Sequence, residues 1–553
     1  MLLLTSLSVA CNSDKEVDFG PVPTITLSNE SGYYSVKVGD EITITPSVSN
    51  GELYAWIVGG SPVSNELSYT FKAVQVGTFY ITFRALNNAG ESNVNITIEV
   101  LPKNPPTVQF IVDDTGVLTF AKGHNYTILP EVTNGDGASY TWTIDGKQAG
   151  SAPTLACMFD AVGSHDISVK VSNEDGSSTA RLSVEVVARL EGKIHMPAQR
   201  YVSQGRTIYL RPVLENFSSP SYEWTVDGVQ QSTDALYAFT PTEQGEYDLM
   251  LSVRDSDGFV ATHNFTVTCC AQEGSYRRDP SSTSLYKWTK VYEYMPAPGQ
   301  FINEANSGFD NVTTAEQAIA YAEKRLSGGN YLSLGGWGGY VVVGFDHSIA
   351  NTGEAEFSIL GNMFDGSSEA GIVWVMQDTN GNGQPDDEWY ELKGSEWGTD
   401  NHSQFHTITY TRAMAAGLGV MWRDGEDNMG RLARNSTHTQ DHYYPKWIKS
   451  LSATYCGSML KADVTVDAAG KYINNAYGWG YADNLGSDAD TTTSGNNGGV
   501  KCHFKISNAV NADGSAASLQ YIDFVKVQTA VSYTDSPLGE ISTEILNIFD
   551  ESK

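Results

Sequence analysis

The eight residues "YTWTIDGK", Tyr140 to Lys147, recur in two variant forms, "YAWIVGG" around Trp56 and "YEWTVDGV" around Trp224. A glycine stands 21 residues after each tryptophan and opens a run of alternating apolar residues, and a second glycine turn follows 13 residues later. These glycines are Gly77, Gly163 and Gly245, then Gly90, Gly176 and Gly258. Three landmarks in register, at a period of about 84 residues, indicate a threefold internal repeat.

The repeats predict immunoglobulin-like β-sandwiches. Period-2 alternation between Gly and Asn turns is typical of antiparallel strands, and about seven short strands around a core tryptophan are typical of this sandwich. The W-x-[IV]-x-G phrase resembles that of PKD domains, although the fuller W-D-F-G-D-G phrase is absent. We expect repeats at 21–102, 103–188 and 189–271, forming a stalk with short linkers such as 101–106. No residue indicates the alternative, that the repeats themselves bind a glycan or protein.

The sequence pattern changes after the repeats: the spacing from tryptophan to glycine stops, and glycine, asparagine and aromatic residues become more frequent. We therefore expect a ligand-binding C-terminal domain at residues 275–553. "TTAEQAIAYAEKRLSGG" has apolar residues at helical spacing, a cap at Thr313 or Thr314 and glycines at its end. Other segments alternate as strands do, for instance "YVVVGFDHSI", "GIVWVMQD" and "YIDFVKVQTA". The predicted fold is therefore mainly β: three sandwiches, then a larger jelly-roll-like sandwich with one or two helices.

Composition limits the classes of function. At 553 residues the chain is too long for one core, and a net charge of −31 argues against nucleic acid as a partner. No apolar run approaches the 18 residues of a spanning helix. Of the cysteines, Cys157, Cys269, Cys270, Cys456 and Cys502 show neither CxxC spacing nor a histidine cluster. A bridge between Cys456 and Cys502 and buried free thiols both fit the sequence.

The first 20 residues predict a lipoprotein signal remnant and linker. "MLLLTSLSVACNSDKE" is an apolar run that ends in small residues before Cys11, which resembles the end of a bacterial lipoprotein signal, although it lacks a positively charged start. This interpretation predicts a lipid on Cys11 and a location on the outer-membrane surface. The alternative is a disordered N-terminus with an ordinary buried cysteine.

The segment "DTNGNGQPDDEW", 378–389, offers an oxygen donor at every second residue. Such spacing can wrap a Ca²⁺ ion, which takes six to eight oxygen ligands. The expected ligands are Asp378, Asn380, Asn382, Gln384, Asp386 and Asp387. Position 12 is Trp389 and not the glutamate of an EF-hand, and strands rather than helices flank the loop. We expect a structural Ca²⁺; the alternative is a polar hairpin turn.

Aromatic residues gather in glycine-rich loops of the C-terminal half. Aromatic faces with Asn, Asp and Gln edges are how proteins hold sugars and large planar cofactors. Tyr477, Trp479 and Tyr481 stand at alternate positions, which predicts one common face. The expected ligand-binding residues are Trp337, Tyr340, His347, Tyr443, Tyr444, Trp447, Tyr477, Trp479 and Tyr481. The alternative for each is core packing.

Motifs of catalysis are missing. There is no G-x-S-x-G, H-E-x-x-H, phosphate loop or dinucleotide fingerprint, and we predict that the protein is not an enzyme. Acids such as Asp424, Glu426 and Asp427 leave a glycosidase pair open. His347, His402 and His406 could ligate cobalt or zinc, but a hydrogen-bonded structural role is the better interpretation.

The phrases "PAPGQFINE", "GGWGGYVVVGFDHSI", "GIVWVMQDTNGNGQPDDEWYELKGSE" and "YGWGYADN" resemble those of surface lipoproteins of gut Gram-negative bacteria, which carry PKD repeats before a C-terminal module. This group includes the BtuH-type vitamin B12-binding lipoproteins. The resemblance covers about 280–545 and implies capture of cobalamin for a TonB-dependent outer-membrane transporter. The alternative is a glycan-binding surface lipoprotein of a polysaccharide-uptake system, and a third interpretation is an adhesin.

Overall fold

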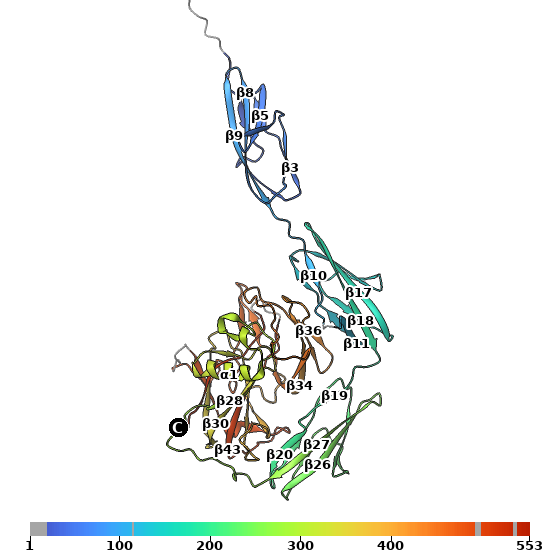
Figure 1. Ribbon diagram of the computed structural model, residues 1–553, viewed down its shortest axis with the longest axis vertical. Helices are drawn as coiled ribbons and strands as arrows, with labels where there is room; N and C mark the ends of the chain where they lie inside the picture. The colour runs from blue at the N-terminus through green and yellow to red at the C-terminus, as the bar shows by residue number, and fades with distance from the viewer. Residues whose placement is uncertain (1–18, 113–114, 493–498, 535–538) are drawn as a thin grey trace, which may run out of the picture. The chain divides into compact units, whose positions relative to one another are not determined.

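The computed structural model describes residues 19–112, 115–492, 499–534 and 539–553 (Figure 1). The lipidation predicted at Cys11 lies outside these residues. The chain divides into two compact units. The first comprises Met1–Pro106, Asn134–Ala138 and Ser172–Ser178, and the second comprises Thr107–Thr133, Ser139–Val171 and Thr179–Lys553.

The three repeats share one strand order, which confirms the predicted sandwiches. Each has a five-stranded sheet opposite two two-stranded ladders. The large sheets have the orders β2-β9-β8-β5-β6, β11-β18-β17-β14-β15 and β20-β27-β26-β23-β24. In each, the first strand pairs in parallel with the last strand of the repeat, and all other pairs described are antiparallel.

The strands of the repeats have the following bounds. Repeat 1 contains β1 (Thr24–Thr26), β2 (Tyr33–Lys37), β3 (Glu41–Ile44), β4 (Ser47–Ser49), β5 (Leu53–Val58), β6 (Ser61–Ser64), β7 (Tyr69–Lys72), β8 (Gly77–Asn87) and β9 (Gly90–Leu101). Repeat 2 contains β10 (Thr107–Gln109), β11 (Val117–Ala121), β12 (Tyr126–Ile128), β13 (Glu131–Thr133), β14 (Ser139–Ile144), β15 (Lys147–Gly150), β16 (Leu155–Cys157), β17 (Gly163–Asn173) and β18 (Gly176–Val187). Repeat 3 contains β19 (Lys193–His195), β20 (Gln199–Ser203), β21 (Ile208–Leu210), β22 (Val213–Glu215), β23 (Ser221–Val226), β24 (Val229–Ser232), β25 (Tyr237–Phe239), β26 (Gly245–Arg254) and β27 (Val260–Cys270).

The repeated tryptophan holds each sandwich together in the same way. Trp56, Trp142 and Trp224 are fully buried, and each indole N–H donates to the carbonyl ten residues later, at 3.0, 2.9 and 2.8 Å. A buried indole needs such a partner, because an unpaired polar group in a core is costly. The ring and its acceptor therefore fix the loop beyond the strand as well as the core.

The C-terminal domain is a larger sandwich, as the alternating segments predict. A six-stranded sheet, β28-β30-β43-β32-β33-β42, faces a five-stranded sheet, β29-β44-β31-β41-β40, and every strand pair in them is antiparallel. One core fills the space between them, with Val341 and Val525 from the first sheet and Ile359 and Ile548 from the second. A four-stranded sheet, β36-β35-β34-β37, and the pair β38-β39 complete the domain.

The main strands of this domain are β28 (Lys290–Met295), β29 (Leu332–Ser333), β30 (Tyr340–Ala350), β31 (Phe357–Gly361), β32 (Gly371–Met376), β33 (Trp389–Leu392), β34 (His402–Thr411), β35 (Val420–Asp424), β36 (Met429–Leu432), β37 (Ser452–Leu460), β38 (Val464–Val466), β39 (Tyr472–Asn474), β40 (Ala489–Asp490), β41 (Val500–Phe504), β42 (Ala509–Val510), β43 (Tyr521–Thr529) and β44 (Glu544–Asp550). Within the described residues the one α-helix is α1 (Ala315–Ser327), where the Thr314 hydroxyl accepts from the N–H of Gln317 at 3.2 Å. This confirms the helix and its cap. Ala318, Ala322 and Leu326 turn its apolar face into the core.

Repeats 2 and 3 contact the C-terminal domain within the second unit. The Tyr126 hydroxyl donates to Asp427, and Arg431 donates to the carbonyl of Pro130 at 2.6 Å. Arg200 pairs with Glu388, and the N–H of Asn216 donates to the carbonyl of Gly425 at 2.9 Å. For these two repeats the expected stalk is wrong, because they pack against the domain that a stalk would hold away.

Candidate functional site

The predicted calcium loop closes a β-hairpin. Met376 at the end of β32 pairs with Trp389 at the start of β33. The loop is held by its own side chains: Asn380 accepts from the N–H of Asn382 at 2.9 Å, and Asn382 accepts from that of Gln384 at 2.7 Å. Both asparagine amides donate to Asp386, at 3.0 and 2.9 Å. Four of the six expected ligands therefore stabilise the turn itself.

The other two expected ligands, Asp378 and Asp387, are nearly buried at 3 and 9 % exposure. One oxygen of Asp378 accepts from Gly383 N–H, and one oxygen of Asp387 accepts from Thr379 N–H, both at 3.0 Å. The second oxygen of each carboxylate is buried and has no hydrogen-bond partner. Two carboxylate oxygens without partners are costly unless a cation or a proton satisfies them.

Electrostatics fit a hard cation at these two carboxylates. Burial, with a smaller contribution from the charges of Asp378 and Asp386, raises the pKa of Asp387 to about 8. Burial also raises the pKa of Asp378. A divalent ion bound by both carboxylates would offset this repulsion with oxygen ligands of the kind Ca²⁺ prefers. Asn380, Asn382 and Asp386 would complete the site only by giving up part of their present bonding, whereas Gln384 would contribute its backbone carbonyl.

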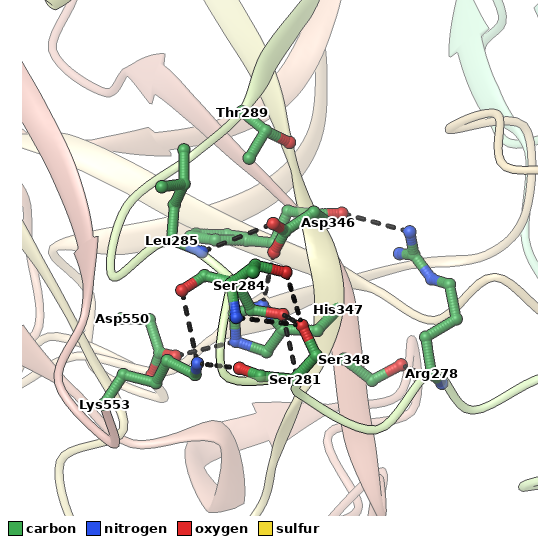
Figure 2. Close-up of polar contacts among 12 residues, drawn as sticks. Arg278, Ser281, Ser284, Leu285, Thr289, Asp346, His347, Ser348, Asp550 and Lys553 are labelled. Carbon is green, nitrogen blue, oxygen red and sulfur yellow. Dashed lines mark hydrogen bonds and ion pairs between the residues drawn. The ribbon is translucent and has the colours of Figure 1, made fainter.

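The three histidines singled out from the sequence all bond to protein groups. Figure 2 shows His347 between Asp346 and Asp550, with ring-nitrogen distances of 2.7 and 2.8 Å. His402 lies 2.7 Å from Glu391, and His406 lies 2.7 Å from the Ser403 hydroxyl. These contacts agree with the structural role that the sequence analysis favoured over a metal ligand.

The close-up also shows how the C-terminus is fastened. Lys553 donates to the carbonyls of Ser281 and Ser284 at 2.6 and 3.2 Å (Figure 2). The Leu285 N–H donates to Asp346 at 3.3 Å. His347 therefore belongs to a polar network that joins the start of the domain to its last strand, and it does not face the aromatic loops.

The expected aromatic site residues lie mostly in cores. Trp337, Tyr443, Tyr444 and the half-buried Trp447 share one cluster, whereas Tyr477 and Tyr481 lie in another. Trp479 is 36 % exposed, so the three alternate aromatics do not form one face. Residues 475–484 form a loop and not a strand, which is why the period-2 argument fails there. Their placement supports the packing alternative.

The glycines around Trp337 serve the same packing. A Cβ on Gly339 would lie 1.8 Å from the carbonyl oxygen of Leu334, and one on Gly335 would lie 2.0 Å from that of Ala297. Backbone segments approach each other where side chains cannot fit. These glycines therefore admit neighbouring protein segments, not the face of a flat ligand as expected.

An aromatic pocket lies elsewhere, between repeat 3 and the hairpin that carries the predicted calcium loop. Its volume is about 270 Å³. Its aromatic lining comes from both domains: Tyr209, Trp374, Trp389, Tyr390 and Phe405. Trp374 and Trp389 lie on adjacent strands, on the face of the hairpin turned away from Val373 and Val375 in the core. This pocket is hereafter the hairpin pocket.

Lys526 forms the cationic part of the hairpin pocket. Its ammonium nitrogen lies 4.8 Å from the ring centre of Trp374, 4.9 Å from that of Trp389 and 5.8 Å from that of Tyr340. Tyr340 is the one expected ligand residue that adjoins this pocket. Burial lowers the pKa of Lys526 to about 8, against the opposing charges of Glu293 and Glu391. Among the described residues no carboxylate lies within ion-pair distance of this amine.

Phe405 enters the pocket from a bulge in β34. The bulge falls between Ser403 and His406, and Phe405 adopts a φ of +66°. A left-handed conformation is strained for a bulky residue, and such strain collects at functional sites. The guanidinium carbon of Arg211 lies 4.2 Å from the centre of the Phe405 ring. The bulge thus presents an aromatic ring to the cavity, and Arg211 of repeat 3 places a second cation beside it.

Sequence reasoning missed Trp374, Trp389, Phe405 and Lys526, although a signal existed for two of them. Trp374 breaks the apolar run "GIVWVMQ", and its cross-strand partner on β43 is Lys526. Strand alternation could have placed Trp374 away from the core. No local sequence pattern predicts the bulge at Phe405, and none predicts that repeat 3 contributes residues to the pocket.

The five described cysteines are free, so the bridge between Cys456 and Cys502 does not form. Asp427, one of the acids considered for a glycosidase pair, lies 2.7 Å from Arg423 and is buried. It therefore has a structural partner on its own hairpin and also accepts from Tyr126.

Comparison with known proteins supports the repeats. Residues 22–87 match the PKD-like domain family and residues 111–186 match the PKD domain family. Polycystin-1 of Homo sapiens is 22 % identical over 204 residues, which are 36 % of this chain and 5 % of that protein. This chain therefore spans a small part of that relative.

Two solved structures are similar to part of this chain. The I67–I69 fragment of the titin I-band covers 46 % of this chain and 100 % of its own, at 14 % identity and a TM-score of 0.23. Fibronectin(III)-like modules of CbhA from Clostridium thermocellum cover 32 % of this chain and 100 % of theirs, at 20 % identity and a TM-score of 0.19. Likenesses at such TM-scores carry no argument about function.

The fold and the matches define a multidomain protein of immunoglobulin-like sandwiches. More narrowly, the chain contains two PKD-type domains, at residues 22–87 and 111–186. PKD domains are common in extracellular or surface proteins and are typically adhesion or structural modules without catalysis. In the part of the chain that the structure describes, no helix is long and apolar enough to cross a membrane.

Proposed function

We propose that this protein is a non-catalytic cell-surface protein that captures a nutrient, and that the ligand is a glycan bound in the hairpin pocket. The observation that carries the proposal is the combination of Trp374, Trp389 and Phe405 with a cation, Lys526, that has no carboxylate partner. Aromatic faces stack on sugar rings, and a few polar groups then fix the orientation of the ligand.

The unpaired ammonium of Lys526 favours an acidic sugar. Lys526 and Arg211 contribute positive charge to a lining that also contains Asp387, Glu388 and Glu391, and none of these acids forms an ion pair with Lys526. A carboxylate on the sugar would pair with Lys526 and restore its full charge in a site where burial disfavours it. A uronic-acid oligosaccharide therefore fits better than a neutral one.

Size separates the glycan from cobalamin. Pockets for drug-sized ligands measure roughly 300–1,000 Å³, and the hairpin pocket measures about 270 Å³. One or two sugar rings suit this volume, whereas cobalamin is much larger than a drug-sized ligand. We therefore place the glycan before cobalamin as the captured nutrient.

The remaining parts of the proposal concern location and delivery. Lipidation at Cys11 would anchor the chain to the outer membrane, and the captured ligand would pass to a TonB-dependent transporter. Labelling cells with radioactive palmitate tests the anchor: the label should enter the wild type and be absent from Cys11→Ala. Equal labelling of both proteins would refute the anchor at this residue.

Titration calorimetry of the full chain tests ligand capture. We expect trigalacturonic acid to bind, and we expect maltotriose and cyanocobalamin to bind at least tenfold more weakly. Trp389→Ala should abolish binding, and Trp479→Ala, which removes an exposed tryptophan outside the pocket, should leave it unchanged. Binding of cyanocobalamin alone, unaffected by Trp389→Ala, would contradict both the ligand and its site.

A further inference from the structure

Three acidic side chains meet inside the C-terminal sandwich, away from the calcium loop. Glu369 stands two residues before β32, Asp483 follows β39 in the chain, and Glu544 is the first residue of β44. Each offers a carboxylate oxygen, and these oxygens lie within 4.8 Å of one another. Asp483 is fully buried and Glu544 is 3 % exposed.

The backbone positions these carboxylates firmly. One oxygen of Asp483 accepts from the N–H groups of Asn362 and Met363, each at 3.0 Å. Its other oxygen accepts from the N–H of Glu544 at 2.9 Å. The N–H of Glu369 donates to the carbonyl of Asp483 at 2.9 Å. The cluster is thus assembled from three separate segments, with Asp483 at its centre.

No cation among the described residues balances the cluster. Neither lysine nor arginine there forms an ion pair with Glu369, Asp483 or Glu544. The charges that raise the pKa of Glu369 and Asp483 come from other acids, whereas hydrogen bonds offset part of the rise for Asp483 and Glu544. Burial raises the pKa of all three carboxyls, well above the usual range for Glu369 and Asp483. Several negative charges cannot stay together in a core without a counter-ion or protons.

A second observation distinguishes this cluster from an ordinary acidic surface. Oε1 of Glu544 is buried and has no hydrogen-bond partner. The same is true of Oε2 of the neighbouring Glu540, whereas Oε1 of Glu540 accepts from the N–H of Gln300. Glu544 is more than nine-tenths buried and lies within the cluster. An unpaired carboxylate oxygen at this depth is costly unless a cation or a proton satisfies it.

We propose that Glu369, Asp483 and Glu544 bind a hard divalent cation, with Ca²⁺ the best fit. The donors are all oxygen, and no histidine or cysteine belongs to the cluster, so the ligand set suits Ca²⁺ or Mg²⁺ and not zinc. The side-chain amide of Asn362, which donates to Glu544 at 3.5 Å, supplies a further polar contact at the rim.

This cation site is separate from the predicted calcium loop. Glu369 precedes β32 and Asp378 follows it, and the strand has six residues. At about 3.3 Å per residue, the strand holds the two sites roughly 20 Å apart. A cation in the cluster would join the start of β32 to the loop beyond β39 and to β44. A cation in the calcium loop would stabilise the turn between β32 and β33.

Counting bound ions in the full chain tests the proposal. After chelation and gel filtration in excess Ca²⁺, Asp387→Asn, which disables the loop, should retain one Ca²⁺ per chain by native mass spectrometry. Glu369→Gln added to this variant should remove that ion, whereas Glu540→Gln, a buried acid outside the three ligands, should leave it. Ca²⁺ should also raise the Tm of Asp387→Asn by about 5 °C.

Either of two results would overturn the proposal. Asp387→Asn that folds but binds neither Ca²⁺ nor Mg²⁺ would show that protons, not a cation, neutralise the cluster. An ion count unchanged by Glu369→Gln would place the ion elsewhere. The ion count on Asp387→Asn needs no substitution in the cluster. It can therefore refute the proposal even if the Glu369→Gln chain fails to fold.

Discussion

Replacing Asp387 by asparagine should change the stability of the C-terminal domain in opposite directions with and without calcium. Without a cation, the side chain is a buried carboxylate close to Asp378, with one oxygen that has no partner. Asparagine removes the charge and can still accept from Thr379 N–H. With a cation, the same change removes a ligand.

The magnitude follows from the pKa of Asp387, which burial raises from 3.8 to about 8. Each unit corresponds to about 1.4 kcal/mol, so the rise of about 4 units makes ionisation of this group cost the folded state on the order of 5–6 kcal/mol at pH 8. Asparagine avoids this cost, but part of the resulting stabilisation is lost because the N–H groups of its side-chain amide have few acceptors in the loop. We expect calcium-free Asp387→Asn to be more stable than the wild type by about 1–3 kcal/mol.

Calcium should make the wild type more stable than Asp387→Asn. At one thousand times its dissociation constant, an ion that binds only the folded loop stabilises it by about 4.1 kcal/mol. The wild type gains this energy and the variant does not. Urea unfolding at pH 8, followed by tryptophan fluorescence in chelator and in Ca²⁺, measures both differences. A variant less stable than the wild type in chelator, or equally stabilised by Ca²⁺, would refute the reasoning.

Three further results are expected. Because the folded pKa of Asp387 lies above its unfolded value, the calcium-free protein should lose stability as pH rises from about 4 to 8, and Ca²⁺ should abolish this trend; a flat profile in chelator would contradict it. Affinity for trigalacturonic acid should fall about tenfold from pH 7 to 9 as Lys526, with a pKa of about 8, loses its charge, and Lys526→Met should remove this dependence in calorimetry. Trp224→Phe should destabilise repeat 3 by about 2–4 kcal/mol in urea unfolding, because Asp234 loses its buried donor, whereas Trp479→Phe should cost less than about 0.5 kcal/mol.

The repeats could be predicted from the sequence because their signals are local. A core tryptophan, a strand opened by glycine and a glycine turn each need only a few residues. Gly77, Gly163 and Gly245 have φ values of 147, 140 and 148°, which a side chain rarely adopts. The same residue is therefore required at the same place in each repeat.

The binding site was harder to predict because it depends on contacts between distant segments. Glycine-rich aromatic stretches predict ligand loops, yet position 338 is glycine because a Cβ there would lie 2.6 Å from the Cβ of Tyr455. The cluster of Glu369, Asp483 and Glu544 joins positions up to 175 residues apart, and nothing in their local sequence links them. The hairpin pocket requires repeat 3, which was expected to be a spacer.

The most direct test of ligand capture is a calorimetric titration of the full chain with trigalacturonic acid at pH 7, beside the Trp389→Ala and Trp479→Ala variants. We predict one-to-one binding for the wild type and Trp479→Ala, and none for Trp389→Ala. Equal binding by all three chains, or no binding by the wild type, would contradict the assignment of the hairpin pocket as a glycan site.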